Sequence, residues 1–383
     1  INKKNLYSVE FTGNICGVNL NIRFHSQKMW FNQTTKKINE IEQYQKVVRI
    51  LRRTLFVIKF FNTYTCNKGE HLTFDLFLVD TPKKLPKNRL DKLDQESINS
   101  GFTTFFNDAN NTKTIIIYRG EEMEKLVIHE LIHFFFLDFK YLKIDLSQIL
   151  NVSPNTEFIP NESFTEFLTI IIHSSVMPIE SIFKRESFKK PNIGSVLNTN
   201  DMYKKEVDMR VVFHVALELL YHEILFGFFQ CAKILYQYNI QRTEDFFQRY
   251  NSKTAPYYYQ KSCIISYFFI KVAMLTNINE SFAFYVSNQI KYKISTDEQT
   301  RKKFKAIIFS SLNNKKFQSN IQRALDFINK QVFNKSVLKK MRKSCRTKKI
   351  NTCIIKRKTN YQTSLSFKRK SKDKFKNLFL NTR

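Results

Sequence analysis

Two histidines four residues apart, with a glutamate beside the first, are the residues of this chain best suited to chemistry. They occur in "EKLVIHELIHFFFLDF", residues 124–139, as His129, Glu130 and His133. On a helix, positions i and i+4 lie on one face, so the two imidazoles can present a nitrogen each to a single point. Zinc binds neutral imidazole well, and two such ligands leave room for a third and for a water. The spacing therefore predicts a zinc site on a helix.

Glu130 is predicted to act as a general base in this site. It lies about 100° round the helix from His129, so its carboxylate reaches a metal-bound water without ligating the metal. Zinc lowers the pKa of that water, and Glu130 would take its proton during attack on a carbonyl. The alternative is coincidence, in which both histidines are core residues bonded to backbone. A β-branched strand pattern at 112–120 and an acidic helix start at Glu121 favour the metal site.

The third ligand is expected from a second helix. A HExxHxxGxxH pattern is excluded because Phe136 and Phe139 stand where it needs glycine and histidine, and Asp138 is expected to face away from the two histidines. Further on, "NESFTE" places Glu162 and Glu166 four apart.

Residues 134–161 are long enough for a loop and a returning helix, so Glu162 is the predicted ligand. Glu166, one turn on, is predicted to orient a ligand histidine. An exposed acidic face is the alternative, but Phe158, Phe164 and Phe167 surround these acids, and partly buried carboxylates need a partner.

The charge of the chain is concentrated at its C-terminal end. The 383 residues carry a net charge of +30, and residues 335–383 hold 18 lysines and arginines against one acid, Asp373. We expect this segment to be an extended tail that binds a polyanion such as nucleic acid, the alternative being a merely solubilising tail. The predicted contact residues are Lys348, Lys349, Lys356, Arg357, Lys358, Lys368, Arg369 and Lys370.

Cysteine usage and hydropathy predict an intracellular, reducing setting without a membrane span. Six cysteines show no CxxC spacing and no dense framework. The most apolar window, 211–236, contains Glu218, Glu223 and Lys233, which a membrane-spanning helix would tolerate poorly.

The order of elements predicts an α+β chain. Strands are expected in 6–26, 72–80 and 112–120, with a helix at 37–61 among them, and helices dominate later. These later helices are predicted near 161–175, 205–238, 257–276, 279–291 and 299–330. The parts are then an N-terminal mixed α/β part (1–120), a metal-binding helical part of the same catalytic unit (121–334) and the basic tail (335–383).

The pair HExxH and NExxxE, here "HELIH" and "NESFTE", resembles the gluzincin metallopeptidases. The resemblance implies a zincin-like fold, with Zn2+ held by His129, His133 and Glu162, and Glu130 as base. It also implies an antiparallel edge strand, here 113–118, that pairs with an extended peptide or protein substrate. Gluzincins add a downstream Tyr or His that stabilises the oxyanion. "LLYHEILFG" offers Tyr221 and His222 for that role, and His222 is favoured, although a histidine in an apolar helix is often structural.

A closer resemblance covers roughly residues 70–290. "KKLP", "INSGFTT", "IIIYRGEEMEKLVIHELIH", "ESFTEFL", "FFQCAKIL" and "SYFFIKVAML" occur in that order. Together they look like an uncharacterised zincin-like family of large nucleocytoplasmic DNA viruses, which supplies no established substrate.

Two functions follow from these patterns. The first is a zinc-dependent peptidase acting in a viral infection cycle, in host cytoplasm or virion. The second is a catalytically retired zincin scaffold that serves as a structural or nucleic-acid-associated protein of a virion or an organellar ribonucleoprotein. The intact Glu130 favours the enzyme, and the charge excess favours the second function.

Overall fold

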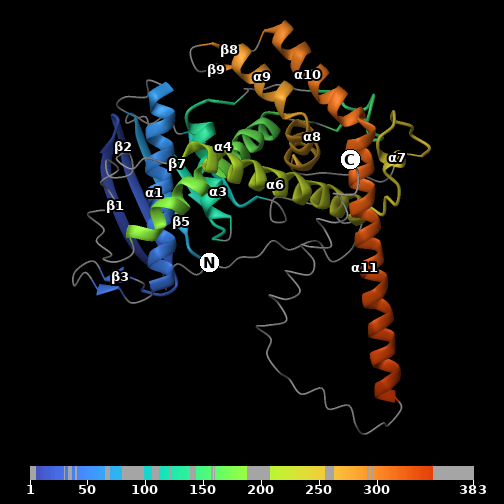
Figure 1. Cartoon of the computed structure of the whole chain (residues 1–383), viewed down its shortest axis with the longest axis horizontal. Helices are drawn as coiled ribbons and strands as arrows, with labels where there is room; N and C mark the ends of the chain where they lie inside the picture. Colours follow the sequence, from blue (N-terminus) through green and yellow to red (C-terminus); the bar gives the residue numbers. More distant parts are fainter. Residues whose placement is uncertain are drawn as a thin grey trace.

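The structure is a computed structural model, and Figure 1 shows a sheet on one side, helices against one of its faces, and a larger helical part beyond them. The residues that it describes are 6–29, 31–32, 37–38, 41–64, 70–79, 99–105, 112–120, 122–138, 144–156, 158, 160–187, 208–254, 263–290, 293–294 and 297–347. The predicted α+β class is confirmed: a mixed sheet comes first and the remainder is mostly helical.

The main sheet has five strands in the order β1-β2-β5-β7-β6. Their bounds are β1 Tyr7–Ile15, β2 Val18–Ser26, β5 His71–Phe77, β6 Gly101–Phe105 and β7 Thr112–Ile117. The three central strands run parallel, and the strand at each edge is antiparallel to its neighbour. A separate small hairpin joins β3 (Phe31–Asn32) and β4 (Lys37–Ile38).

Alternating side chains explain why the central strands form this layer. Along β2 and β5 every second residue is fully buried, including Ile22, Phe24 and Phe74, while the residues between them lie on the outer face of the sheet. The long helix α1 (Ile41–Tyr64) connects β2 to β5, which run parallel and therefore need such a crossover. The core thus lies between the sheet and its helices.

The helical part contains more breaks than the sequence predicted. Its elements are α3 Met123–Phe134, α4 Asn161–Ser187, α6 Met209–Gln237, α7 Thr243–Phe246, η3 Ser266–Ile270 (a π-helix), α8 Lys271–Thr276, α9 Ile278–Asn288, the pair β8 Gln289–Ile290 and β9 Lys293–Ile294, α10 Glu298–Asn313 and α11 Lys315–Thr347. The single helix expected near 299–330 is wrong, because Asn314 separates α10 from α11. Its backbone is extended, and its side-chain oxygen accepts from the amides of Lys316 and Phe317, which caps α11.

The predicted edge strand at 113–118 is also wrong. This segment is β7, which is hydrogen-bonded on both sides, to β5 and to β6. The edge position next to α3 belongs instead to β6, "GFTTF", a short strand that the sequence patterns did not indicate.

The expectation of an extended tail from residue 335 is wrong for its first part. Helix α11 continues to Thr347, and Figure 1 shows this end of α11 running on past the other helices. The eight tail residues predicted to contact nucleic acid, Lys348, Lys349, Lys356, Arg357, Lys358, Lys368, Arg369 and Lys370, lie outside the described residues.

Within the described part of the chain, one helix, α6, is long and apolar enough to cross a membrane by length and composition. Its C-terminal half packs into the protein: Leu235 and Cys231 are fully buried, and Phe228 contacts Phe317 of α11 with ring centroids 5.8 Å apart. Its N-terminal half is mostly exposed, including Met209, Val211 and Phe213, so the expected absence of a membrane span stays a prediction.

Candidate metal centre

Helix α3 presents both histidines to one point. It follows β7 after a short turn, and most of its residues from Leu126 on are buried apolar side chains, so His129 and Glu130 are buried among leucines and isoleucines. His129 and His133 are one turn apart, as the spacing predicts, and their Nε2 atoms lie 3.2 Å from each other. Two imidazole nitrogens therefore face the same small volume.

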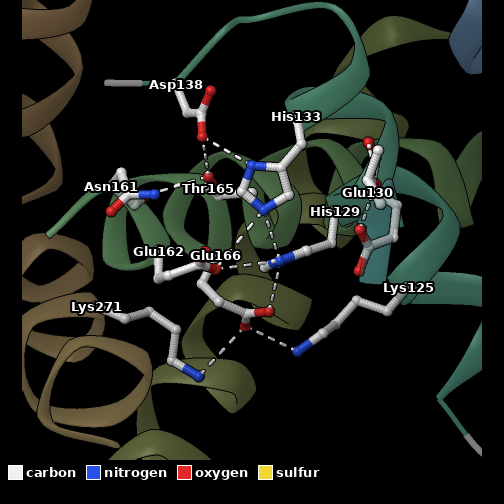
Figure 2. A network of polar contacts seen from close by, with 11 residues as sticks. Lys125, His129, Glu130, His133, Asp138, Asn161, Glu162, Thr165, Glu166 and Lys271 are labelled. Atoms are coloured by element: carbon white, nitrogen blue, oxygen red, sulfur yellow. Dashed lines mark hydrogen bonds and ion pairs between the residues drawn. The ribbon is translucent and has the colours of Figure 1, made fainter. Parts of the chain in front are cut away.

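Helix α4 supplies a carboxylate to that volume (Figure 2). Glu162 lies in the first turn of α4, where the helix dipole favours an acid. Its Oε2 is 3.5 Å from Nε2 of His129 and 3.6 Å from Nε2 of His133. These three residues form a group that could hold a metal ion.

The spacing of the three donor atoms fits zinc. A tetrahedral zinc with bonds of about 2.0–2.1 Å requires its ligand atoms to be about 3.3 Å apart. The three observed separations, 3.2, 3.5 and 3.6 Å, lie close to that value. In addition, Glu162 Oε2 is buried without a hydrogen-bond donor among the described residues, which is costly for a carboxylate oxygen unless a cation binds it. Two imidazoles and one carboxylate are also a donor set that zinc uses in catalytic sites.

Electrostatics in the centre favour positive charge. Burial opposes protonation of His129, but interactions with Glu162 and Glu166 outweigh it and raise the pKa of His129 to about 9. The pKa of His133 is likewise raised well above its usual value, against burial, by Asp138 and Glu162. Burial alone would raise the pKa of the Glu162 carboxyl, yet the two histidines hold it far below its usual range. A divalent cation bound here would be stabilised by the same carboxylates.

Each histidine also has a carboxylate on its other ring nitrogen. Glu166 Oε1 lies 2.9 Å from Nδ1 of His129, and Asp138 Oδ2 lies 2.7 Å from Nδ1 of His133. Thr165 Oγ1 is 3.4 Å from the same Asp138 oxygen. The contact of His133 is a hydrogen bond, whereas that of His129 is a close ion-pair contact without hydrogen-bond geometry. Carboxylates in these positions orient a metal-binding histidine so that its Nε2 faces the metal.

The position of Asp138 corrects the expectation that it faces away. Helix α3 ends at Phe134, and Phe136 has a φ of 55°, in the left-handed region. The chain therefore turns back after the helix, and the helical spacing used to place Asp138 does not apply at that point.

Glu130 lies beside the edge strand β6. Its Oε2 accepts a hydrogen bond of 2.6 Å from Thr103 Oγ1. Gly101, at the start of β6, leaves space next to the other oxygen: a Cβ there would be 2.8 Å from the carbonyl oxygen of Ile116 and 3.4 Å from Glu130 Oε1. The glycine thus permits a close approach of the strand to the proposed base.

His222 does not join this cluster. It is exposed on α6, and its Nδ1 lies 2.6 Å from the carbonyl oxygen of Glu218 on the preceding turn. The location of His222 therefore does not support the predicted role of this residue in stabilising the oxyanion. His173 of α4 also lies apart from the ligands, with its Nδ1 3.1 Å from the guanidinium of Arg53.

Tyr267, unlike His222, lies close to the metal-binding histidines. Its ring centroid is 6.5 Å from that of His129. Burial, and after it the negative charge of Glu162, raise the pKa of Tyr267 well above its usual value, so the hydroxyl stays protonated. It belongs to the π-helix η3, a type of segment that often occurs at functional sites. "SYFFI" has no pattern that distinguishes it from a core helix, so the sequence alone does not indicate a role for Tyr267.

Two lysines complete the polar network. Lys125 Nζ lies 3.0 Å and Lys271 Nζ 3.7 Å from Glu166 Oε2. Neither was singled out from the sequence, because a lysine on an apolar helix carries no recognisable signal for a site.

Comparisons with known proteins give one distant relative. The chain is 26% identical over 178 residues to "Uncharacterized protein R210" of Acanthamoeba polyphaga mimivirus. The match covers 46% of this chain and 40% of that protein, so it spans less than half of either. No protein-family model matches, and no solved structure matches. The relative points to a large nucleocytoplasmic DNA virus, as expected, while the zincin family itself is not shown.

Proposed function

We propose that this protein is a zinc-dependent peptidase of the gluzincin kind. The observation that carries the proposal is the convergence of His129 Nε2, His133 Nε2 and Glu162 Oε2 at 3.2–3.6 Å. The neighbouring Glu130 is buried and can act as the base that hydrolysis requires. A purely structural zinc site has no need of such a base.

Zinc held by these three residues would polarise a carbonyl and lower the pKa of a bound water. Glu130 takes a proton from the attacking water at Oε1, the carboxylate oxygen nearer Gly101, while Thr103 holds Oε2. The protonated carboxyl then donates to the leaving amine. The hydroxyl of Tyr267 donates a hydrogen bond to the oxyanion, since its raised pKa keeps the proton in place.

The edge strand β6 suits an extended substrate. Gly101–Phe105 has a neighbour, β7, on one side, and it lies against α3 beside Glu130. An extended peptide that pairs with the other side of β6 would bring its carbonyl groups to the base. The substrate class is therefore a peptide or protein segment without regular secondary structure. The mimivirus relative supports a setting in viral infection, in host cytoplasm or virion.

The test compares the purified parent with Glu130→Gln. Both should contain one zinc per chain by elemental analysis, because Glu130 is not a ligand. Glutamine keeps nearly the same volume but cannot accept the proton, so hydrolysis of a peptide library should fall by about two to four orders of magnitude. A variant that cleaves as well as the parent, or a parent that cleaves nothing, would remove the case for an enzyme.

A second candidate function is a zincin-like scaffold that binds nucleic acid without catalysis. The charge of +30 and the basic segment 335–383 favour it. It predicts the same zinc content in parent and Glu130→Gln, with no hydrolysis in either. The two functions are compatible, since a basic tail can hold a peptidase at its target.

A further inference from the structure

Two lysines from different helices converge on one oxygen of Glu166, on the side of His129 away from His133 (Figure 2). Lys125 of α3 and Lys271 of α8 both approach Oε2, at 3.0 and 3.7 Å. The other oxygen, Oε1, lies 2.9 Å from Nδ1 of His129. The carboxylate is thus divided, with one oxygen held by cations and the other directed at the histidine.

This arrangement is expensive as a device for stability. The side chains of Glu166 and Lys271 are 8% and 10% exposed, and removing such charges from water is strongly unfavourable. A single lysine would be enough to neutralise the charge of Glu166, so neutralisation does not explain why two are present. Lys125 also interacts with the negative charges of Glu122 and Glu223. Buried ion pairs often add little net stability. The role of Lys125 and Lys271 is therefore better inferred from their contacts with Glu166, which in turn contacts His129.

The two lysines also connect the elements that build the site. Lys125 is four residues before His129 on α3, so both lie on one helical face. Lys271 is four residues after Tyr267, at the junction of η3 and α8. Anchoring Lys271 on Glu166 therefore fixes the segment that carries Tyr267 against α4.

We propose that Lys125 and Lys271 are positioning residues of the metal centre, which anchor Oε2 of Glu166 so that Oε1 stays on Nδ1 of His129. A carboxylate held on one side only can rotate about its last bonds, and the direction of His129 Nε2 would then vary. With both lysines in place the imidazole is oriented before the metal binds. This inference rests on the proposed zinc site and extends it to residues that touch neither metal nor substrate.

The test measures zinc affinity by competition with a chelating dye for the parent, Lys125→Met, Lys271→Met, Glu166→Gln and each lysine variant combined with Glu166→Gln. Each single lysine variant should bind zinc about tenfold more weakly, within the range for partners of metal-bound histidines. In the Glu166→Gln background the same lysine change should weaken binding no further, because its effect passes through that carboxylate. An equal weakening in both backgrounds would overturn the proposal, as would single variants that bind like the parent.

Controls separate this role from folding and from general charge. Lys125→Arg keeps a donor at the same place and should restore affinity. Lys302→Met removes one positive charge from an exposed pair with Glu298 and should leave zinc affinity unchanged. Circular dichroism identifies any variant that fails to fold, and Lys271→Met alone decides the question if Lys125→Met is such a variant. A parent that binds no zinc would overturn the metal site together with this inference, whereas a zinc-binding parent with unaffected lysine variants would overturn this inference alone.

Discussion

Among single residues, His129 and His133 share one feature: each has a carboxylate oxygen close to its Nδ1. A carboxylate oxygen of Glu166 lies against Nδ1 of His129, and one of Asp138 lies against Nδ1 of His133. Each imidazole in its neutral form then keeps its lone pair on Nε2, the atom that faces Glu162. The ability of His129 and His133 to bind a metal therefore depends on Glu166 and Asp138 as well as on the histidines themselves.

The roles of Tyr267 and His222 are distinguished by substitution. Tyr267→Phe removes one hydroxyl from the buried cluster and should lower turnover by about two orders of magnitude, with zinc content unchanged. His222→Ala is the matched control, because that side chain is exposed on α6 and should be dispensable for hydrolysis. Peptide hydrolysis and metal analysis of both variants check this, and the reverse result would return the oxyanion role to His222.

Among the elements, one buried guanidinium holds the two ligand helices together. Arg53 of α1 donates from Nε to Glu180 of α4 at 2.8 Å and from a terminal nitrogen to the carbonyl oxygen of Glu124 of α3 at 3.0 Å. The same terminal nitrogen lies 3.1 Å from Nδ1 of His173, also on α4. A guanidinium is always charged and cannot accept a hydrogen bond, so His173 must present an unprotonated Nδ1 to it. The relative position of α3 and α4, and with it the metal centre, depends on this guanidinium.

The pairing of Arg53 with His173 predicts a stability that depends on pH. Burial, and then the charges of Arg53 and Lys125, lower the pKa of His173 to about 3, whereas an unfolded chain has a histidine pKa of about 6.5. The unfolded state therefore binds the extra proton first. The contribution is complete above about pH 6.5 and disappears as the pH falls toward 3.

His173→Gln removes this titration while keeping a hydrogen-bond acceptor for Arg53. Between about pH 6 and 5 the free energy of unfolding of the metal-free parent should fall by about 1 kcal/mol more than that of the variant. Denaturant unfolding at each pH, with a chelator present in both samples, measures the difference. Parallel curves for parent and variant would contradict the assigned pKa.

For the whole molecule, charge and catalytic groups are separated along the chain. The metal centre lies between α3 and α4, while 18 of the 63 lysines and arginines fall in 335–383, beginning within α11. The C-terminal end of helix α11, where this basic segment begins, runs on past the other helices in Figure 1. We therefore expect polyanion binding and metal binding to depend on different residues of the chain.

Removal of residues 348–383 tests that separation, since it leaves α11 complete. The shortened protein should keep its circular dichroism spectrum and its zinc, and should bind duplex DNA more weakly. The slope of log affinity against log salt should become shallower by about 0.9 for each phosphate that the shortened protein no longer neutralises. Glutamine at the eight predicted nucleic-acid-binding positions in the full chain is the matched control for length. Unchanged DNA affinity in both variants would move the binding surface to the folded part.

The sequence by itself determined the local chemistry of the centre. Spacing of four on α3 places His129 and His133 on one face, and the same spacing on α4 relates Glu162 to Glu166, because helical geometry depends only on hydrogen bonds between near neighbours. Alternation in β2 and the β-branched run in β7 likewise predicted those strands and the α+β class.

Only the tertiary structure decided which distant groups meet those residues. The left-handed Phe136 returns Asp138 to His133, and β6 takes the edge beside Glu130, although five residues of "GFTTF" have too little alternation to predict a strand. Tyr267 reaches His129 from a segment far along the chain. Such contacts depend on how whole elements pack, and no periodicity within one segment of the sequence encodes that packing.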